Sequence, residues 1–273
     1  MLKMLTAHTL EIDDEQEALH EILAQLNLAG STCKHSIAML SCHPDCVETG
    51  VAQYISAKLP FDTVGFTTIS SRTSGAQEVP MLSIAVLTSD TVRFTSAWVP
   101  GLTKGATPAI KSAMQSAIAA GPGGSPSLIF PFFPFAQGIS VEALMDTVME
   151  TARNVPMFGT ISIDNTKDYS NCYTLYNGVA SKTGFAAILF FGDITPRFFV
   201  AAVPSENLHS AHAIVTKSHQ NILQEVNGKP FVEYLNSVGI TDESGMMSVP
   251  FMVDSHDGAG MVARAIYAIT PEG

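Results

Sequence analysis

The chain has 273 residues, of which 46% are hydrophobic and 14% charged, and its formal net charge is −11. This composition supplies a large apolar core and excludes a disordered chain, which would combine low hydrophobicity with a high proportion of charge. An acidic surface lacks the counterion release that drives most nucleic-acid binding, and the lysines and arginines are scattered singly. We therefore expect no nucleic acid and no anionic membrane as partners.

The start of the chain and its apolar runs indicate a soluble protein. Acidic residues begin at Glu11, before any apolar stretch long enough for a signal peptide. The most apolar runs, 128–135 and 185–191, are far shorter than the roughly 18 residues of a membrane-spanning helix. Four cysteines are too few for a disulfide framework in a chain of this length. The sequence thus predicts a cytoplasmic protein with free thiols.

The first half of the chain predicts two helices and four strands. Apolar residues recur at helical spacing over 13–28, where Asp13 or Asp14 can cap the helix and Gly30 can end it. They recur in the same way over 44–59. Strands are expected between and after these helices, in HSIAML, PFDTVGFTTIS, MLSIAVLTSD and TVRFTSAWV.

The second half repeats this order. One helix is expected over 107–120, with Thr107 as its cap and Pro108 at its first position, and another over 141–153. The GPGG stretch at 121–124 ends the first of them. The second half also carries an added segment, NCYTLYNGVASKT, whose Asn-Gly pair predicts a hairpin turn. The matching strands are SLIFPFFPF, NVPMFGTISID, GFAAILFFGD and TPRFFVAAV.

These matched segments predict an α/β protein with an internal duplication. We expect α-β-α-β-β-β units over 13–100 and 107–203, which form a layered sandwich of mixed sheets flanked by helices within a first domain at 1–204. The alternative is that ordinary α/β alternation produces the likeness. Residues 205–273 predict a partial α+β region of two strands, a short helix and two more strands, which ends within an unfinished β segment.

Two matched loops carry the candidate ligand-binding residues. Glycine permits close approach of the main chain to another group, and hydroxyls both donate and accept hydrogen bonds. Loops from related units would face each other and could bracket a small polar ligand, whereas the alternative is that they are solvated turns. Arg72 offers recognition of a carboxylate and Asp164 an ammonium partner, which would suit an amino acid. The candidates are Gly65, Thr67, Thr68, Arg72, Gly159, Thr160, Ser162 and Asp164.

The segment CKHSIAMLSCHPDC raises two other possibilities, a metal site and a catalytic thiol. Its possible ligands are Cys33, His35, Cys42, His43 and Cys46. Their spacing matches none of the usual zinc patterns, so no metal is expected. Cys42 and His43 are a weak nucleophile pair, because neighbours in sequence rarely point toward each other. Since phosphate-loop and dinucleotide-binding motifs are also absent from the sequence, no cofactor is expected.

Several segments together resemble the FIST sensory domain. They are TVGFTTIS with LSIAVLTSD, PMFGTISIDN with GFAAILFFGD, and VTKSHQNILQEVNGKPFVEYLNSVGI. The resemblance assigns 35–203 to the family's N-terminal domain and the chain from 211 onward to the start of its C-terminal domain. It implies binding of a small ligand, amino acids being the usual suggestion, and signalling to kinase, cyclase, chemoreceptor or F-box partners without catalytic residues.

Two details of the resemblance concern single residues. MVARAIYAITPEG is similar to the family's arginine-containing strand, which implies Arg264 as a further ligand-binding residue. FGTISID departs from the double glycine of many members, which weakens the expectation of close main-chain approach at Thr160.

Three functions are consistent with the sequence. The first is a non-enzymatic intracellular sensory module that binds a small polar ligand for signal transduction. The second is an uncharacterised hydrolase or transferase that uses Cys42, His43 or Asp164, and the third is a ligand-free scaffold for protein partners. The sequence shows no set of nucleophile, base and orienting residue, which favours the first. An exposed edge strand could also pair two copies into a homodimer.

Overall fold

The computed structural model describes residues 2–69, 81–103, 106–135, 139–164, 166, 169–199, 212–219, 222–241, 251–254, 261–266 and 269. The chain divides into two compact units, 1–198 and 199–273. The division lies close to the expected domain boundary at 204.

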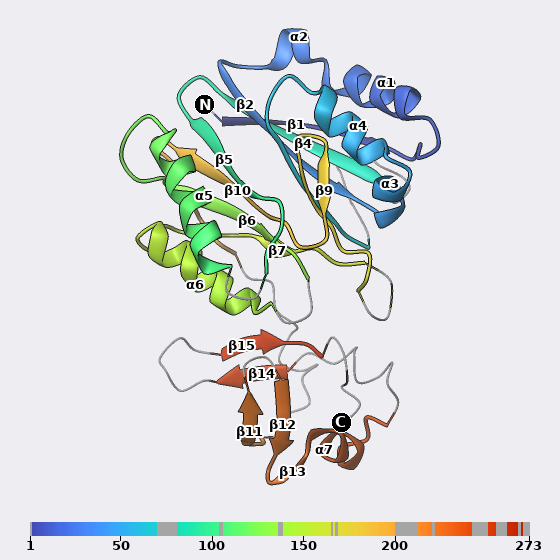
Figure 1. Cartoon of the computed structure of the whole chain (residues 1–273), viewed down its shortest axis with the longest axis vertical. Coiled ribbons are helices and arrows are strands. Elements are labelled where there is room, and N and C mark those ends of the chain that lie inside the picture. The colour runs from blue at the N-terminus through green and yellow to red at the C-terminus, as the bar shows by residue number, and fades with distance from the viewer. Residues whose placement is uncertain are drawn as a thin grey trace. The chain divides into compact units, whose positions relative to one another are not determined.

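The first unit interleaves strands and helices over 2–67 and 93–161, and consecutive strands make up most of the rest (Figure 1). Its helices are α1 (Glu15–Leu26), α2 (Leu28–Ser31), α3 (Pro44–Glu48), α4 (Val51–Lys58), α5 (Thr107–Ala119) and α6 (Val141–Thr151). Its strands are β1 (Leu2–Thr9), β2 (His35–Cys42), β3 (Thr63–Thr67), β4 (Leu82–Ser89), β5 (Arg93–Val99), β6 (Leu128–Phe133), β7 (Thr160–Ile161), β8 (Thr174–Tyr176), β9 (Val179–Ser181) and β10 (Phe185–Phe191).

The strands of the first unit form two mixed sheets. The first sheet has the order β1-β4-β2-β3-β8-β9 and the second the order β5-β10-β6-β7. Each sheet contains a parallel pair of strands joined through helices, β2 with β3 in the first sheet and β6 with β7 in the second. In the first sheet β4 lies between β1 and this pair, and in the second sheet β10 lies between β5 and its pair. The two sheets therefore share one connectivity, and an internal duplication of the sequence stays a prediction. The expected unit over 13–100 ends with the strand Arg93–Val99, but this strand, β5, pairs with β10 and so belongs to the second sheet.

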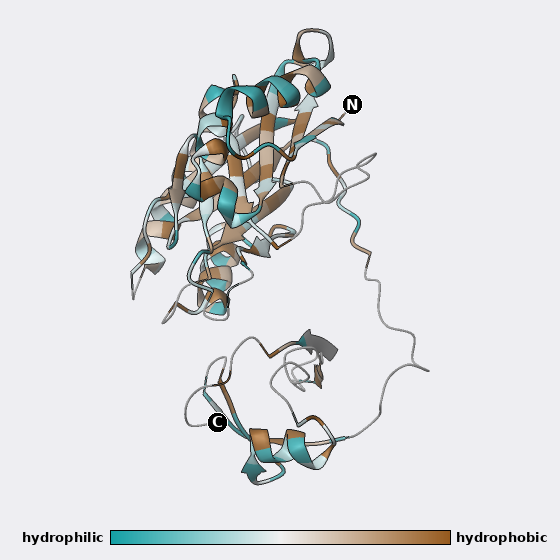
Figure 2. Cartoon of the chain, turned by 90° about the vertical axis from the view of Figure 1, so that its right-hand side faces the viewer, coloured by the Kyte–Doolittle hydropathy of each residue, from teal (hydrophilic) through white to brown (hydrophobic). Residues whose placement is uncertain are grey.

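Three apolar clusters show that the unit has four layers. One cluster lies between α1, α3, α4 and the first sheet, and another between α5, α6 and the second sheet. The third joins the facing surfaces of the two sheets, with Val64 and Phe66 on one side and Phe132 and Ile188 on the other. Figure 1 shows the helices on the two outer sides of the strands, and Figure 2 shows that the strands between them are mainly hydrophobic. We call this third cluster and the polar residues at its ends the inter-sheet layer.

Local chemistry explains where most of the helices begin and end. Asp14 caps α1 by accepting hydrogen bonds from the main chain of Gln16 and Glu17, as expected. Asn27, with a φ of 44°, ends this helix in place of the predicted Gly30. The single helix expected over 44–59 is wrong, because Gly50 has a φ of 91° and separates α3 from α4.

The ends of the first unit contain two further differences from the expectation. Sequence reasoning missed β1, which pairs along its full length with β4 at the edge of the first sheet. The strand expected over 195–203 is not found at 195–199, and residues 200–203 lie outside the described part of the chain. In the described residues, no helix is long and apolar enough to cross a membrane.

The added segment forms the expected hairpin and connects the two sheets. Asn177 and Gly178 have φ values of 45° and 87°, as the turn requires, and Tyr176 pairs with Val179 across it. The segment follows β7 of the second sheet, yet β8 pairs with β3 of the first sheet. Residues from the second half therefore complete the first sheet.

The second unit has its own small core. Its elements are β11 (Val215–His219), β12 (Ile222–Val226), β13 (Lys229–Pro230), α7 (Phe231–Ser237), β14 (Phe251–Asp254) and β15 (Met261–Arg264). The strands form a three-stranded sheet, β11-β12-β13, and a two-stranded sheet, β14-β15. Val226, Phe231 and Leu235 are buried together. The order of strands and helix matches the sequence prediction except for the short strand β13, where a turn was expected.

Candidate functional site

The two predicted loops meet where β3 and β7 end. The main-chain N–H of Ile163, just after β7, donates a hydrogen bond of 3.0 Å to the carbonyl of Thr67 at the end of β3. The N–H of Ser162 donates to the carbonyl of Phe133 in β6 at 2.9 Å. On the other side, the N–H of Thr68 donates to the carbonyl of Cys42 in β2 at 2.9 Å. The carboxyl ends of both parallel pairs thus converge at one end of the inter-sheet layer.

Thr67 holds this junction together through its side chain and its main chain. It is fully buried. Its hydroxyl accepts a hydrogen bond of 2.8 Å from the N–H of Tyr173, and its own N–H donates to the Tyr173 carbonyl at 2.9 Å. Thr67 therefore joins β3, the loop after β7 and the segment before β8, and its hydroxyl has a structural partner.

Ser162 is the most distinctive residue of the junction. Its exposed fraction is 0%. Ile161 packs in the cluster beneath α5 and α6, so alternation of side chains directs Ser162 toward the inter-sheet layer. Within the described residues, its hydroxyl oxygen has no hydrogen-bond partner. A buried hydroxyl without a partner costs about 1–3 kcal/mol, which a ligand could offset by accepting or donating there.

Asp164 organises its own loop. One carboxylate oxygen accepts from the N–H and the hydroxyl of Thr166 at 2.8 and 2.7 Å, and the other accepts from the N–H of Asn171 at 2.6 Å. Only 3% of the residue is exposed. Burial, together with the neighbouring Asp164 carboxylate, raises the pKa of the Cys172 thiol to about 12. Both oxygens already have partners, so a role as the ammonium partner of a ligand stays a prediction.

Both predicted glycines have packing reasons. Gly65 lies inside β3, where an added Cβ would lie 3.0 Å from the Leu40 carbonyl oxygen and 3.3 Å from the Leu175 Cβ. Gly159 precedes β7, and its Cβ would lie 2.0 Å from the carbonyl oxygen of Pro131. A side chain is excluded at Gly159 because the neighbouring strand is too close, and at Gly65 the neighbouring atoms would have to shift by a few tenths of an ångström to accommodate one. This close approach serves strand packing, and contact of these glycines with a ligand stays a prediction.

The remaining predicted residues have different placements. The Thr160 hydroxyl donates to the carbonyl of Ile161 at 3.2 Å and lies half-buried beside the junction, as does Thr68. Arg72 lies outside the described residues. Arg264 is an exposed residue of β15 in the second unit. The structure therefore brings together Thr67, Thr68, Thr160, Ser162 and Asp164.

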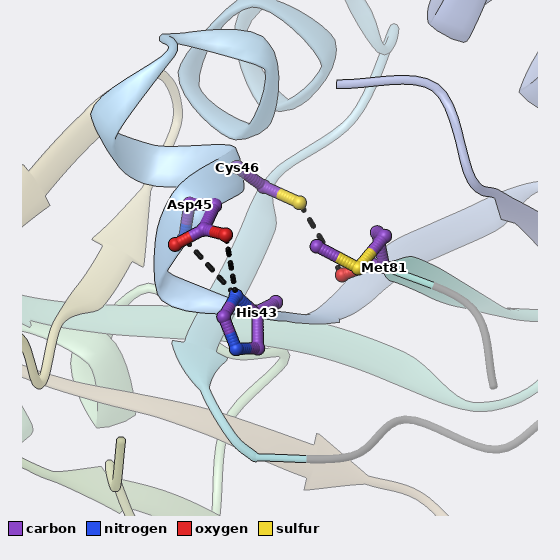
Figure 3. Close-up of polar contacts among 4 residues, drawn as sticks. All are labelled: His43, Asp45, Cys46 and Met81. Atoms are coloured by element: carbon purple, nitrogen blue, oxygen red, sulfur yellow. Dashed lines mark hydrogen bonds and ion pairs between the residues drawn. The ribbon is translucent and has the colours of Figure 1, made fainter. Parts of the chain in front are cut away.

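The cysteine and histidine residues near the end of β2 have structural roles (Figure 3). The Cys46 thiol donates to the Met81 carbonyl at 3.3 Å, and His43 Nδ1 lies 3.3 Å from an Asp45 carboxylate oxygen. Cys42 is buried. Its hydrogen bond with Cys46 raises the pKa of its thiol well above the usual value, and the loss of solvent around the thiol raises the pKa further. Within the described residues, no three histidine, cysteine or acidic side chains are placed to hold a metal ion.

Two surface cavities lie at other places in the first unit. One, of about 370 Å³, is lined by residues near the carboxyl ends of α5 and α6, including Gln115, Thr151 and Arg153. The other, of about 420 Å³, lies near the amino end of β2 and includes Cys33 and His35. Neither is lined by a predicted ligand-binding residue.

Comparison with known proteins gives the family. A family model described as the FIST N domain matches residues 9–229. The chain belongs to this family. FIST domains are sensory domains, which is consistent with a role in signal transduction. The match includes residues 211–229, which the resemblance assigned to the C-terminal domain. That assignment stays a prediction for the rest of the chain.

The other comparisons add little to the FIST assignment. No curated protein matches the chain. Among solved structures, the chain is similar to cyanuric acid hydrolase from A. caulinodans, with 10% identity, a TM-score of 0.34, and coverage of 70% of this chain and 71% of that one. A likeness this distant carries no functional argument.

Proposed function

We propose that this FIST protein is a non-enzymatic sensory module that binds a small polar ligand of the amino-acid class at the junction of its two sheets. The observation that carries the proposal is the buried hydroxyl of Ser162, which has no partner within the described residues, at the point where Ile163 is hydrogen-bonded to Thr67. Most buried polar groups in proteins are hydrogen-bonded. A polar ligand would provide the partner of Ser162.

The surroundings of Ser162 suit a small molecule that forms hydrogen bonds. Thr68 and Thr160 are half-buried beside it and carry hydroxyls. Hydroxyls can donate to a carboxylate and accept from an ammonium group, so they can recognise both ends of an amino acid. Apolar side chains lie in the same layer as these hydroxyls. The rings of Phe66 and Phe132 stack there with their centroids 5.3 Å apart. Apolar walls with a few polar groups are typical of ligand sites.

Cys42 and Cys172 are poorly suited to act as catalytic nucleophiles. A cysteine nucleophile reacts as the thiolate, which requires a lowered pKa and access to substrate. Cys42 and Cys172 are buried and their pKa values are raised. The side-chain nitrogen His43 Nδ1 faces Asp45 rather than a buried thiol in Figure 3. These features support the binding function over hydrolysis or group transfer through these residues.

The junction also offers a route to a signal. Ile163 belongs to the loop that leaves the second sheet, and Thr67 belongs to the first sheet, so their hydrogen bond couples the two layers. A ligand that binds one arrangement of these layers better than another shifts the equilibrium between them. A downstream signalling protein or domain that contacts either sheet could then respond to occupancy.

A thermal-shift screen of the twenty L-amino acids tests this function. A ligand at 100 times its Kd adds about 2.7 kcal/mol to the free energy of unfolding, which raises the Tm by about 5–10 °C for a chain of this size. We expect at least one amino acid to do so, and we expect Ser162→Ala to lose most of the rise. Thr160→Val should reduce it if that hydroxyl also contacts the ligand.

The control is Ser36→Ala, which removes a hydroxyl that contacts Thr88 near the other end of β2. It should keep the full ligand-induced rise in Tm. A wild-type protein whose Tm no amino acid raises would refute the proposal, and a rise that persists in Ser162→Ala would move the site elsewhere.

A further inference from the structure

The larger of the two surface cavities, of about 420 Å³, lies at the amino end of β2 and is lined by residues of both sheets. Phe61 comes just before β3 of the first sheet, and Phe94 belongs to β5 of the second. Leu28 of α2 adds a further apolar side chain. Sites for small molecules typically have volumes of about 300–1,000 Å³ and mainly apolar walls with a few polar groups. The cavity has both properties.

Two half-buried phenyl rings form part of its wall. Phe61 packs against the cluster beneath α1, α3 and α4. Phe94 packs in the inter-sheet layer, where its ring lies edge-on to that of Phe190 with the centroids 5.4 Å apart. The core therefore holds each ring in place, while part of each ring stays accessible from the cavity. Aromatic rings prefer stacked or edge-on contact with other rings, so this wall favours an aromatic ligand over an aliphatic one of the same size.

The polar part of the wall is basic. Lys34 and His35 line the cavity, and none of the described residues that line it is acidic. The ion pairs found among the described residues involve neither of the two. Two carboxylates lie close to the lining but already accept hydrogen bonds, Asp90 from the main-chain N–H of Lys34 at 3.1 Å and Asp62 from three side chains of its own network. An ammonium group and an imidazole N–H are suited to bind a carboxylate.

The local charge decides the sign of the ligand, although the whole chain is acidic. Charges further away than about 8 Å are largely screened at physiological ionic strength, so the net charge of −11 acts weakly at any one site. The nearest charged group of the lining is the ammonium of Lys34, which attracts an anion and repels a cation. A carboxylate is therefore favoured over an ammonium group in this cavity.

The hydroxyls of the cavity already have partners within the protein. The Ser36 hydroxyl lies 2.8 Å from that of Thr88, and the Thr32 hydroxyl donates to the Leu28 carbonyl at 3.0 Å. Neither is left over to accept from the ammonium group of an amino acid. The cavity thus suits a simple acid, which needs donors only.

We infer that this cavity is a separate binding site for a small aromatic carboxylate, whose ring lies against Phe61 and Phe94 and whose carboxylate is bound by Lys34 and His35. The site is independent of the function proposed at Ser162, and either can fail without the other. Sequence reasoning considered His35 only as a metal ligand, because a phenyl ring from β5 comes beside it only in the folded protein.

Cys33 provides a direct measure of occupancy. It lines the cavity and is half-buried, whereas Cys42, Cys46 and Cys172 are buried. N-Ethylmaleimide should therefore modify Cys33 alone in the folded protein, and peptide mass spectrometry identifies the modified residue. A ligand in the cavity covers this thiol, so the ligand concentration that halves the modification rate measures the affinity.

Three compounds of similar size test the ring and the charge separately. We expect phenylacetate to protect Cys33 at millimolar concentrations, and phenylacetamide and cyclohexylacetate each to need about threefold more. Lys34→Gln should raise the half-protecting concentration of phenylacetate about threefold and leave that of phenylacetamide unchanged. The control is Lys111→Gln at an exposed position in α5, which removes the same charge and should leave both values unchanged.

Several outcomes would overturn the inference. A Cys33 thiol that the maleimide does not reach, or that phenylacetate does not protect, would show that the cavity does not bind the acid. Protection by the amide or the aliphatic acid that equals protection by phenylacetate would remove the proposed specificity, as would equal effects of Lys34→Gln and Lys111→Gln. Ser162→Ala should leave the protection by phenylacetate unchanged, and its loss in this variant would place the acid at the junction instead.

Discussion

The two ends of the inter-sheet layer differ in whether their polar side chains are hydrogen-bonded. At the amino end of β3, the Asp62 carboxylate accepts from the Ser96 hydroxyl at 2.5 Å, from the Tyr176 hydroxyl at 3.3 Å and from the Asn177 amide at 2.9 Å. At the carboxyl end, the hydroxyls of Ser83 and Ser162 have no partner among the described residues. One end is a network of bonded side chains that joins the sheets, and the other has buried hydroxyls whose hydrogen-bonding capacity is unused among the described residues.

The difference arises from the connections at each end. The Asp62 network draws on β5 of the second sheet and on the hairpin between β8 and β9, which brings Asn177 beside the start of β3. Tyr176 also stacks on Trp98, with ring centroids 5.7 Å apart. The end of the layer near the carboxyl end of β3 is formed by strand ends and loops, which are joined there by main-chain hydrogen bonds. These bonds do not involve the hydroxyls of Ser83 and Ser162.

The largest effect is expected from removing Asp62. Asp62→Ala should lower the free energy of unfolding by about 3 kcal/mol, because three donors lose their shared charged acceptor. Chemical denaturation with urea measures this change. Asp146→Ala, at an exposed position in α6, should leave stability within about 0.5 kcal/mol. Equal effects of the two variants would show that the network does not join the sheets.

A smaller effect with a distinct pH dependence is expected at Tyr176. Burial raises the pKa of its hydroxyl above the usual value of 10. Above pH 10 the unfolded chain releases this proton while the folded protein keeps it, so the free energy of unfolding falls as pH rises. Tyr176→Phe should cost about 1 kcal/mol at pH 7 and should reduce that fall. Urea titrations between pH 8 and 11 compare the two proteins, and parallel pH profiles would contradict the assignment.

The smallest effect is expected at the carboxyl end, in the absence of ligand. Ser162→Ala removes a buried hydroxyl that has no described partner, so the free energy of unfolding should stay within about 0.5 kcal/mol of wild type or rise. The matched comparison is Ser96→Ala, which removes a bonded hydroxyl and should cost about 1 kcal/mol. A larger loss at Ser162 than at Ser96 would reverse the contrast between the two ends.

Local patterns predicted much of the fold. The apolar stripe over 141–153 corresponds to α6, the Asn-Gly pair to the hairpin turn at Asn177, and the strand patterns after residue 211 to the small second unit. Each of these signals depends on neighbours in sequence. The missed strand β1 lies in a segment where apolar and polar residues alternate weakly, and only its pairing with β4 defines it.

The candidate site was predicted in part. The two loops do meet, and Ser162 lies at their junction. The roles of individual residues differ, because Gly65 and Gly159 face neighbouring strands at packing distance and the Asp164 carboxylate is used by its own loop. The buried hydroxyl of Ser83 was not predicted either, although its place between two buried apolar residues of β4 indicates a side chain on the opposite face of the sheet.

The sequence by itself determined the α/β class, the order of most elements and the membership of a sensory family, since these depend on periodicity, turn residues and motif likeness along the chain. Only the tertiary structure decided which hydroxyls are left without partners. That property depends on groups far apart in sequence, such as Thr67 with Tyr173 and Ile163, which satisfy one another when the sheets pack. A hydroxyl is available to a ligand only after every neighbour in space has been accounted for.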